Sequence, residues 1–366
     1  MNDKFKKQKI FFEFLRYSIG SDSEIPSSLK EADWKELYRI AQKQALLGVL
    51  FYGIRRLPKE LAPEQKLLMQ WMVMAEQIRK QNIRLFLDSV KVCKNFENKG
   101  FANCILKGQG NALLYPDPYM RTPGDIDIYL SGGRRKIMKY VDQVCPNLVM
   151  RYHHVDFPVM KTAIEVHFTP SYMFCPIHNR RKQKWFEEVM GEQCNHRVSL
   201  PDGYGEIHVP QVSFNVIYVL SHLYRHIFTE GIGLRQLLDY YYVLISDDLL
   251  LIRDRVQKEL KHLGLWKFAQ AVMFVMKEVF GLSEDRMIAP MAEKEGRFLL
   301  DEIMRGGNFG QYDDRMGSKV GESKIHRYFR MNLRNLRFVK HYPAEALSEP
   351  LFRTWFAVWK KIHAIE

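Results

Sequence analysis

Two aspartates one residue apart are the residues of this chain best placed to do chemistry. Asp125 and Asp127 alternate with Ile126 and Ile128, and this alternation predicts a β-strand. Side chains at i and i+2 leave a strand on the same face, so the two carboxylates should lie side by side. Two carboxylates that close repel each other and shift each other's pKa unless a cation lies between them. Because Mg²⁺ is commonly held by one or two carboxylates together with substrate phosphates, the pair predicts a metal site that handles phosphates.

A third carboxylate follows on the predicted strand 163–168, which reads Ala-Ile-Glu-Val-His-Phe. The alternation places Glu165 and His167 on one face and the apolar side chains on the other. If this strand neighbours the first, three acidic groups could hold two metal ions, Mg²⁺ or Mn²⁺. Two such ions stabilise both the attacking and the leaving oxygen of an in-line displacement at phosphorus. We expect Asp127→Asn to abolish metal-dependent turnover and to leave thermal stability intact or improved, because the change relieves repulsion.

The region that must position these carboxylates is predicted to be an α/β core at 99–210. Short apolar runs between glycine and proline turns predict strands at 101–106, 126–130, 148–152, 155–160 and 163–168. A short helix at 112–115, a loop at 116–123 and a helix that begins at Gly132 lie among them. We therefore expect a small mixed sheet of four or five strands.

Both ends of the chain are predicted to be helical, at 1–98 and 211–366. An amphipathic helix comes first, and Ser28 is the expected N-cap of a second. Pro63 opens a longer helix that stops at Gly100. The predicted fold is α+β, with helices from both ends of the chain around the central sheet.

The composition restricts where the protein works and what it meets. Of the 366 residues 46% are hydrophobic, enough for a large buried core, and no apolar run is long enough to cross a bilayer. Five cysteines without a C-x-x-C pair argue against a disulfide framework and a thiolate metal site, so we expect a cytoplasmic protein with no membrane partner. The net charge of +13 and the isoelectric point near 9.3 favour a polyanionic partner, which could be a nucleotide, a nucleic acid or an acidic protein.

Five segments together resemble the uncharacterised bacterial nucleotidyltransferase family of the DNA polymerase β superfold. They are residues 107–113, 115–128, 165–168, 222–226 and 233–239. The resemblance implies a nucleotidyltransferase core in which Asp125, Asp127 and Glu165 bind the catalytic metals. It also implies transfer of an NMP group from an NTP to an acceptor hydroxyl or phosphate, with release of pyrophosphate.

The resemblance also implies which residues bind the nucleotide. The place of the superfamily's Gly-Ser phosphate loop is taken by a turn of Gly108, Gln109, Gly110 and Asn111. No serine is present at this turn. Lys107 and Arg121 would lie close to the triphosphate.

Each of these two cations has a structural alternative. Lys107 ends a buried strand, where a solvated lysine is common. The planar fork of Arg121 suits phosphate oxygens, and the alternative is a salt bridge to Asp117 or Asp125.

Residues of the C-terminal helices are further candidates for contacts to the cleft or the acceptor, together with His167. His222 and His226 lie at i and i+4, a spacing that can bind zinc. Because no zincin glutamate or third ligand accompanies them, we expect them to pack against the core or to approach the nucleotide. Arg235 and Asp239 share this spacing, which predicts an intrahelical ion pair, and the resemblance adds a role in closing the cleft.

A row of arginines marks one face of a predicted helix near the C-terminus. It consists of Arg327, Arg330, Arg334 and Arg337. This face could bind the phosphate backbone of a nucleic-acid acceptor. The alternative is a basic face whose partners are acidic residues elsewhere in the fold.

Two other functions stay open for the same fold. One is a toxin-like nucleotidyltransferase that acts on tRNA or protein, which the arginine row favours. The other is a non-catalytic module that binds a nucleotide or nucleic acid, which the missing serine favours.

Overall fold

The sheet that holds the acidic residues is small, mixed and four-stranded. The structure is a computed structural model that describes residues 3–316 and 323–362. Its strands are β1 (Asn103–Leu106), β2 (Ile126–Leu130), β3 (His154–Asp156) and β4 (Ile164–His167), in the spatial order β1-β2-β4-β3. β2 and β4 run parallel, and the other two pairings are antiparallel. The predicted mixed sheet is confirmed.

One face of the sheet is apolar because isoleucine and valine alternate with polar residues along β2 and β4. Ile126, Ile128 and Val166 are fully buried and share a hydrophobic cluster with the second half of α4 (Gln65–Asn98). The polar side chains of these strands therefore point to the opposite face.

Several strand boundaries differ from the prediction. β1 begins two residues later than expected, and β3 ends at Asp156 because Pro158 lacks the N–H that a longer strand would need. The segment 148–152 is not a strand: Met150 makes one isolated bridge to Val155. A hairpin of β5 (Arg197–Ser199) and β6 (Glu206–His208) was not predicted.

The short helix after β1 lies earlier than predicted. α5 spans Gly108–Ala112, whereas the sequence predicted a glycine turn followed by a helix at 112–115. The chain reverses at Lys107 and Gly108, whose φ angles are +57° and +45°. The prediction of a turn that continues through residues 109–111 is therefore wrong, because these residues already belong to α5.

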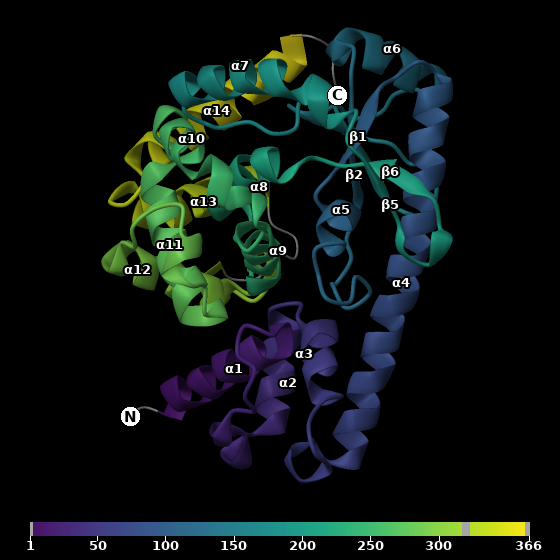
Figure 1. Ribbon diagram of the computed structural model, residues 1–366. Helices are drawn as coiled ribbons and strands as arrows, with labels where there is room; N and C mark the ends of the chain where they lie inside the picture. The colour runs from purple at the N-terminus through teal and green to yellow at the C-terminus, as the bar shows by residue number, and fades with distance from the viewer. Residues whose placement is uncertain (1–2, 317–322, 363–366) are drawn as a thin grey trace.

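The N-terminal helices are α1 (Asp3–Ile19), α2 (Trp34–Lys43), α3 (Leu47–Ile54) and α4. Ser28 is not the N-cap of α2: its hydroxyl donates to Glu13, and Asp33 caps the helix by accepting the backbone N–H groups of Lys35 and Glu36 at 3.1 Å. The long helix predicted after Pro63 is confirmed as α4. Figure 1 shows α4 running from the N-terminal helices at the bottom of the view up to the sheet.

Helices form most of the rest of the chain. They are α6 (Gly133–Val144), α7 (Pro176–Gln193), α8 (Val212–Thr229), α9 (Leu234–Leu244), α10 (Asp248–His262), α11 (Trp266–Phe280), α12 (Glu293–Gly306), α13 (Lys324–Val339) and α14 (Pro343–Ile362). Short 3₁₀ helices lie at Ser27–Glu31, Lys59–Leu61, Pro201–Gly203, Glu284–Arg286, Asn308–Gly310 and Asp314–Met316. In Figure 1 the helices α8 to α13 gather beside the sheet, with α5 between them and α4.

The two helical ends of the chain pack against each other. α1 contacts α11, and both contribute to one large hydrophobic cluster. The last helix, α14, docks through Phe352, Trp355 and Phe356, whose rings pack around Tyr152. Over residues 3–316 and 323–362, no helix combines the length and the apolar character needed to cross a membrane.

Candidate active site

The three predicted carboxylates come together at one end of the parallel strand pair. Asp127 of β2 lies in register with Glu165 of β4, and Asp125 immediately precedes β2. The negative charge of Asp127 and burial together raise the pKa of Asp125 to about 6. The sheet therefore places Asp125 and Asp127 side by side, as their spacing predicted.

Lys107 and His167 both bind Asp127. The Lys107 ammonium donates to Asp127 Oδ2 at 3.0 Å, and His167 Nε2 donates to Oδ1 at 2.9 Å. Burial alone would raise the pKa of Asp127, but these two partners outweigh burial and lower it. The two aspartates are therefore not equivalent, and the expectation that Asp127→Asn preserves stability is reversed.

His167 links two of the carboxylates. Its Nε2 lies 3.4 Å from Glu165 Oε2 as well as 2.9 Å from Asp127. Burial would lower the pKa of His167, but hydrogen bonds to Asp127 and Glu165 raise it. The two carboxylates thus favour the protonated form of the His167 imidazole on β4.

Two adjacent histidines of the site, His153 and His154, open a predicted strand and were given no functional role from the sequence. His154 Nδ1 lies 3.2 Å from His153 Nε2 and 3.5 Å from Glu165 Oε2. Burial and the charge of His167 lower the pKa of His154 to about 2. The sequence feature that could have identified them is the His-His pair at the start of β3, the strand that pairs with β4.

Arg121 has a structural partner that the sequence did not predict. Its guanidinium donates two hydrogen bonds to the carboxylate of Asp239 on α9, at 2.7 and 2.8 Å, and the Tyr115 hydroxyl donates to the same carboxylate at 2.7 Å. Arg121 is 5% exposed, and its backbone oxygen accepts a hydrogen bond from Asn82 of α4. The guanidinium therefore holds the loop 116–123 in place and is committed to Asp239 rather than free for a triphosphate.

Arg235 lies beside the turn that leads into β2. Its Nη1 donates to the Thr122 backbone oxygen at 3.1 Å, and a Cβ on Gly124 would lie 3.9 Å from the same nitrogen. Burial and the charge of Arg121 lower the pKa of Arg235. The predicted intrahelical pair with Asp239 is replaced by the longer-range pair of Asp239 with Arg121.

The histidines of α8 occupy different environments. His222 Nε2 accepts a hydrogen bond from Lys107 at 3.2 Å and so reaches the core. His226 instead contacts Arg225 at 2.9 Å and Glu230 at 3.3 Å. Among the contacts described, His222 reaches the carboxylates indirectly, through Lys107, which also binds Asp127.

A second set of cations, Arg225 and Lys182, was also missed. The side chain of Lys182 on α7 is fully buried, and its amine has no hydrogen-bond partner among the described residues. Burial and the charge of Arg225 lower the pKa of Lys182 well below its usual value. Arg225 likewise lowers the pKa of His153 and His154, although burial is the larger cause. No motif in the sequence marks either cation.

The predicted phosphate turn is packed inside the protein. Gln109 and Asn111 of α5 are 2% and 1% exposed, and Gln109 Oε1 and Asn111 Nδ2 lack hydrogen-bond partners among the described residues. A Cβ at Gly110 would lie 2.9 Å from a Val209 methyl group, so a glycine is needed for this packing. Gly108 is buried at the start of α5.

The family of the chain follows from its sequence match. Residues 30–281 match the family described as uncharacterised nucleotidyltransferase, a span that includes the whole sheet and the helices from α2 to α11. The chain belongs to this nucleotidyltransferase family. No curated protein and no solved structure matches it.

The arginine row of this nucleotidyltransferase does not form one exposed face. Arg334 is 8% exposed and packs over the Phe338 ring, and Arg337 binds Glu302 and Asp313 at 2.9 and 3.3 Å. Arg337 has the acidic partners elsewhere in the fold that the alternative predicted, whereas Arg334 is buried beside an aromatic ring and donates to Asn335. Arg327 is exposed, and Arg330 is partly exposed.

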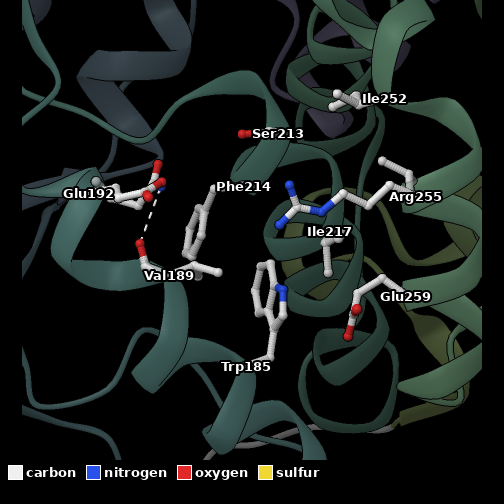
Figure 2. A pocket seen from close by; sticks show the side chains of 11 residues that line it. Trp185, Val189, Glu192, Ser213, Phe214, Ile217, Ile252, Arg255 and Glu259 are labelled. Carbon is white, nitrogen blue, oxygen red and sulfur yellow. Dashed lines mark hydrogen bonds between the residues drawn. The ribbon is translucent and has the colours of Figure 1, made fainter.

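One hollow of this nucleotidyltransferase lies between α7, α8 and α10, away from the carboxylates. Figure 2 shows the rings of Trp185 and Phe214 beside the Arg255 guanidinium. Its cavity of about 60 Å³ is far below the roughly 300 Å³ of a small ligand pocket. No residue of the predicted site lines it, so it does not change the location of the candidate active site.

Proposed function

We propose that the protein transfers a nucleoside monophosphate from an NTP to an acceptor hydroxyl or phosphate. The observation that carries the proposal is the placement of Asp127 and Glu165 in register on two parallel strands, with Asp125 directly before the first of them. In the reaction an acceptor oxygen attacks the α-phosphorus, the bond to the β-phosphate oxygen breaks, and pyrophosphate leaves with the bonding electrons. The proton of an acceptor hydroxyl passes to a base or to water.

The carboxylates fit divalent cations, Mg²⁺ or Mn²⁺, and two ions during turnover. Asp125 has a pKa of about 6 because Asp127 repels its negative charge, so a cation between them would remove an unfavourable interaction. Asp125, Asp127 and Glu165 would hold the ions, which would supply positive charge to the attacking and leaving oxygens.

Cations of the chain itself support binding of a triphosphate. Lys107 already contacts Asp127 and could turn to a phosphate oxygen when a metal neutralises that carboxylate. Arg225 is partly buried, and the buried Lys182 amine has no hydrogen bond among the described residues, so a bound anion would stabilise the positive charge of both side chains. Arg121 and the helical residues Gln109 and Asn111 have structural roles in this proposal.

The test combines binding with turnover. Thermal unfolding would be measured with each NTP, with and without Mg²⁺ or Mn²⁺, on the wild type, on Asp125→Asn and on the control Asp142→Asn, an exposed carboxylate of α6. We expect a rise in midpoint that needs both metal and triphosphate and that is lost only in Asp125→Asn. Release of pyrophosphate with candidate acceptors measures turnover. If no NTP raises the midpoint under any metal condition, the proposal is wrong.

A second candidate function is a nucleotide-binding module without turnover. It is favoured by the contacts of Lys107 and His167 to Asp127, which neutralise this carboxylate without a metal. In that case a nucleotide would raise the unfolding midpoint without metal, and no pyrophosphate would form.

A further inference from the structure

A cysteine, a histidine and a glutamate meet where the start of α7 touches the start of α14. Cys175 directly precedes α7, His178 lies in its first turn, and Glu345 lies in the first turn of α14. The Cys175 Sγ, a ring nitrogen of His178 and a carboxylate oxygen of Glu345 all lie within 4.8 Å of one another. We infer that these three residues bind Zn²⁺, at a site separate from the carboxylates of β2 and β4.

The donor atoms have the spacing of ligands around one ion. His178 Nδ1 lies 3.6 Å from Glu345 Oε1, which is too long for a hydrogen bond. Zinc binds nitrogen and oxygen at about 2.0–2.2 Å and sulfur at about 2.3 Å, so the ligands of a tetrahedral Zn²⁺ lie roughly 3.2–3.8 Å from each other. Small side-chain rotations therefore suffice to bring the three atoms onto one ion.

The His178 nitrogen that lacks a partner is the one that faces Glu345. Nδ1 is buried and has no hydrogen bond among the described residues. The other side of the ring rests against Gly264, where a Cβ would lie 2.4 Å from Nε2. This close approach fixes the orientation of the ring. Because buried polar atoms normally have a partner, the arrangement points to a cation at Nδ1.

The carboxylate of Glu345 is held in position by the backbone before α7. Glu345 is 1% exposed, its Oε2 accepts the N–H of Phe174 at 2.6 Å, and its Oε1 accepts the N–H of Cys175 at 3.1 Å. Each carboxylate oxygen has further lone-pair capacity, so Oε1 can bind an ion as well. Hydrogen bonds of this kind orient the carboxylates that ligate metals.

The donor set decides which ion is preferred. Thiolate sulfur and imidazole nitrogen suit Zn²⁺, whereas Mg²⁺ takes oxygen ligands. Three protein ligands leave the fourth tetrahedral position to water. Cys175 and His178 are partly exposed, which gives the ion and the water a path from solvent. Binding converts the Cys175 thiol to a thiolate and releases its proton to water.

The third ligand explains why the sequence did not show this site. Cys175 and His178 form a Cys-x-x-His pair, but Glu345 is 170 residues away from Cys175. The lack of a C-x-x-C pair argued against a thiolate site only for ligands close in sequence. Figure 1 shows α14 beside α7, and α14 lies beyond the span 30–281 that matches the family. An ion here would tie this C-terminal helix to α7.

The experiment uses Co²⁺ as a spectroscopic substitute for Zn²⁺ in the full-length protein. Thiolate bound to Co²⁺ gives a near-ultraviolet charge-transfer band, which carboxylate and imidazole ligands do not give. We expect this band with the wild type, its loss on addition of Zn²⁺, and its absence in Cys175→Ser. The control is Cys145→Ser, because Cys145 is also partly buried and lies outside the cluster. No band with the wild type, or a full band in Cys175→Ser, would overturn the inference.

A second measurement covers the case in which Cys175→Ser does not fold. In the wild type, Zn²⁺ should protect Cys175 from alkylation, as mass spectrometry of the peptides would show. His178→Gln should weaken Zn²⁺ binding roughly tenfold or more, because loss of an outer partner of a ligand alone costs about 10–100-fold. Equal alkylation of Cys175 with and without Zn²⁺ would contradict the site. Neither measurement uses a nucleotide, so the result does not depend on the proposed function.

Discussion

The two neighbouring aspartates should respond in opposite ways to loss of charge. In Asp125 the folded-state pKa of about 6 lies above the usual 3.8, because Asp127 repels its charge. In Asp127 the folded-state pKa is lowered, because Lys107 and His167 outweigh the effect of burial. We therefore expect Asp125→Asn to stabilise the metal-free protein and Asp127→Asn to destabilise it.

The size of the Asp125 effect follows from its pKa. A difference of about two pKa units corresponds to about 3 kcal/mol, and because the side chain is partly exposed, screening by water reduces this to about 1–3 kcal/mol. Since the folded-state pKa is raised, the charged carboxylate lowers the free energy of unfolding as the pH rises from about 4 to about 6. The increase in the free energy of unfolding that Asp125→Asn brings should reach its full size above pH 7 and be about half as large at pH 5.

Asp127→Asn should lower the free energy of unfolding, whereas Asp125→Asn should raise it, and the cause is different. Removing the charge of Asp127 leaves Lys107 and His167 without their carboxylate partner, and breaking a buried ion pair such as that of Lys107 with Asp127 costs about 3–5 kcal/mol. Because the folded-state pKa of Asp127 is lowered, its stabilising contribution is present above the unfolded-state pKa near 4 and is lost as the pH falls.

The assay is chemical denaturation at pH 5 and pH 8 in metal-free buffer with a chelator. Asp142→Asn, an exposed carboxylate on α6, is the control and should change the free energy of unfolding by less than about 0.5 kcal/mol. Adding Mn²⁺ should then stabilise the wild type more than Asp125→Asn. If both aspartate variants shift the free energy of unfolding in the same direction at pH 8, the reasoning is refuted.

Further variants test the parts that hold the site. Arg121→Met and Asp239→Asn should each lower the free energy of unfolding by about 3–5 kcal/mol, with the double variant losing less than the sum, as a double-mutant cycle by denaturation would measure. Gly48→Ala should lower the free energy of unfolding by about 1–3 kcal/mol, because its Cβ would lie 2.3 Å from a backbone oxygen. Gly191→Ala, whose Cβ would point into open space on α7, should leave the free energy of unfolding unchanged or raise it in the same assay. Lys182→Met should raise the thermal midpoint at pH 7, because burial lowers the pKa of this amine while the unfolded lysine stays charged; an unchanged or lower midpoint would contradict this.

Local patterns in the sequence were enough to predict the elements that carry the site. The alternation of isoleucine with aspartate defined β2, and the Glu-Val-His segment defined β4 with its polar face, because strand periodicity depends on adjacent residues. The long helix α4 was likewise predictable from its apolar spacing and from the proline and glycine near its ends.

Boundaries that depend on single hydrogen bonds were less predictable. The sequence offered Ser28 as a helix cap, but Asp33 is the residue whose carboxylate meets the free N–H groups of α2. It also offered a turn over Gly108 to Asn111, but the chain reverses at Lys107 and Gly108, whose φ angles are positive, and residues 109–111 are already helical. Both outcomes depend on how the chain packs, which neighbouring residues alone do not determine.

The sequence by itself determined that Asp125 and Asp127 lie on one side of their segment and that Glu165 and His167 share the polar face of another strand. The pairing of these two strands was decided by the tertiary structure. The tertiary structure decided which partners these and the other charged residues take. Asp127 is neutralised by Lys107 and His167, and Arg121 binds Asp239, which is 118 residues away. A side chain's face follows from the local backbone period, but its partner, and therefore its pKa, depends on segments that only folding brings together.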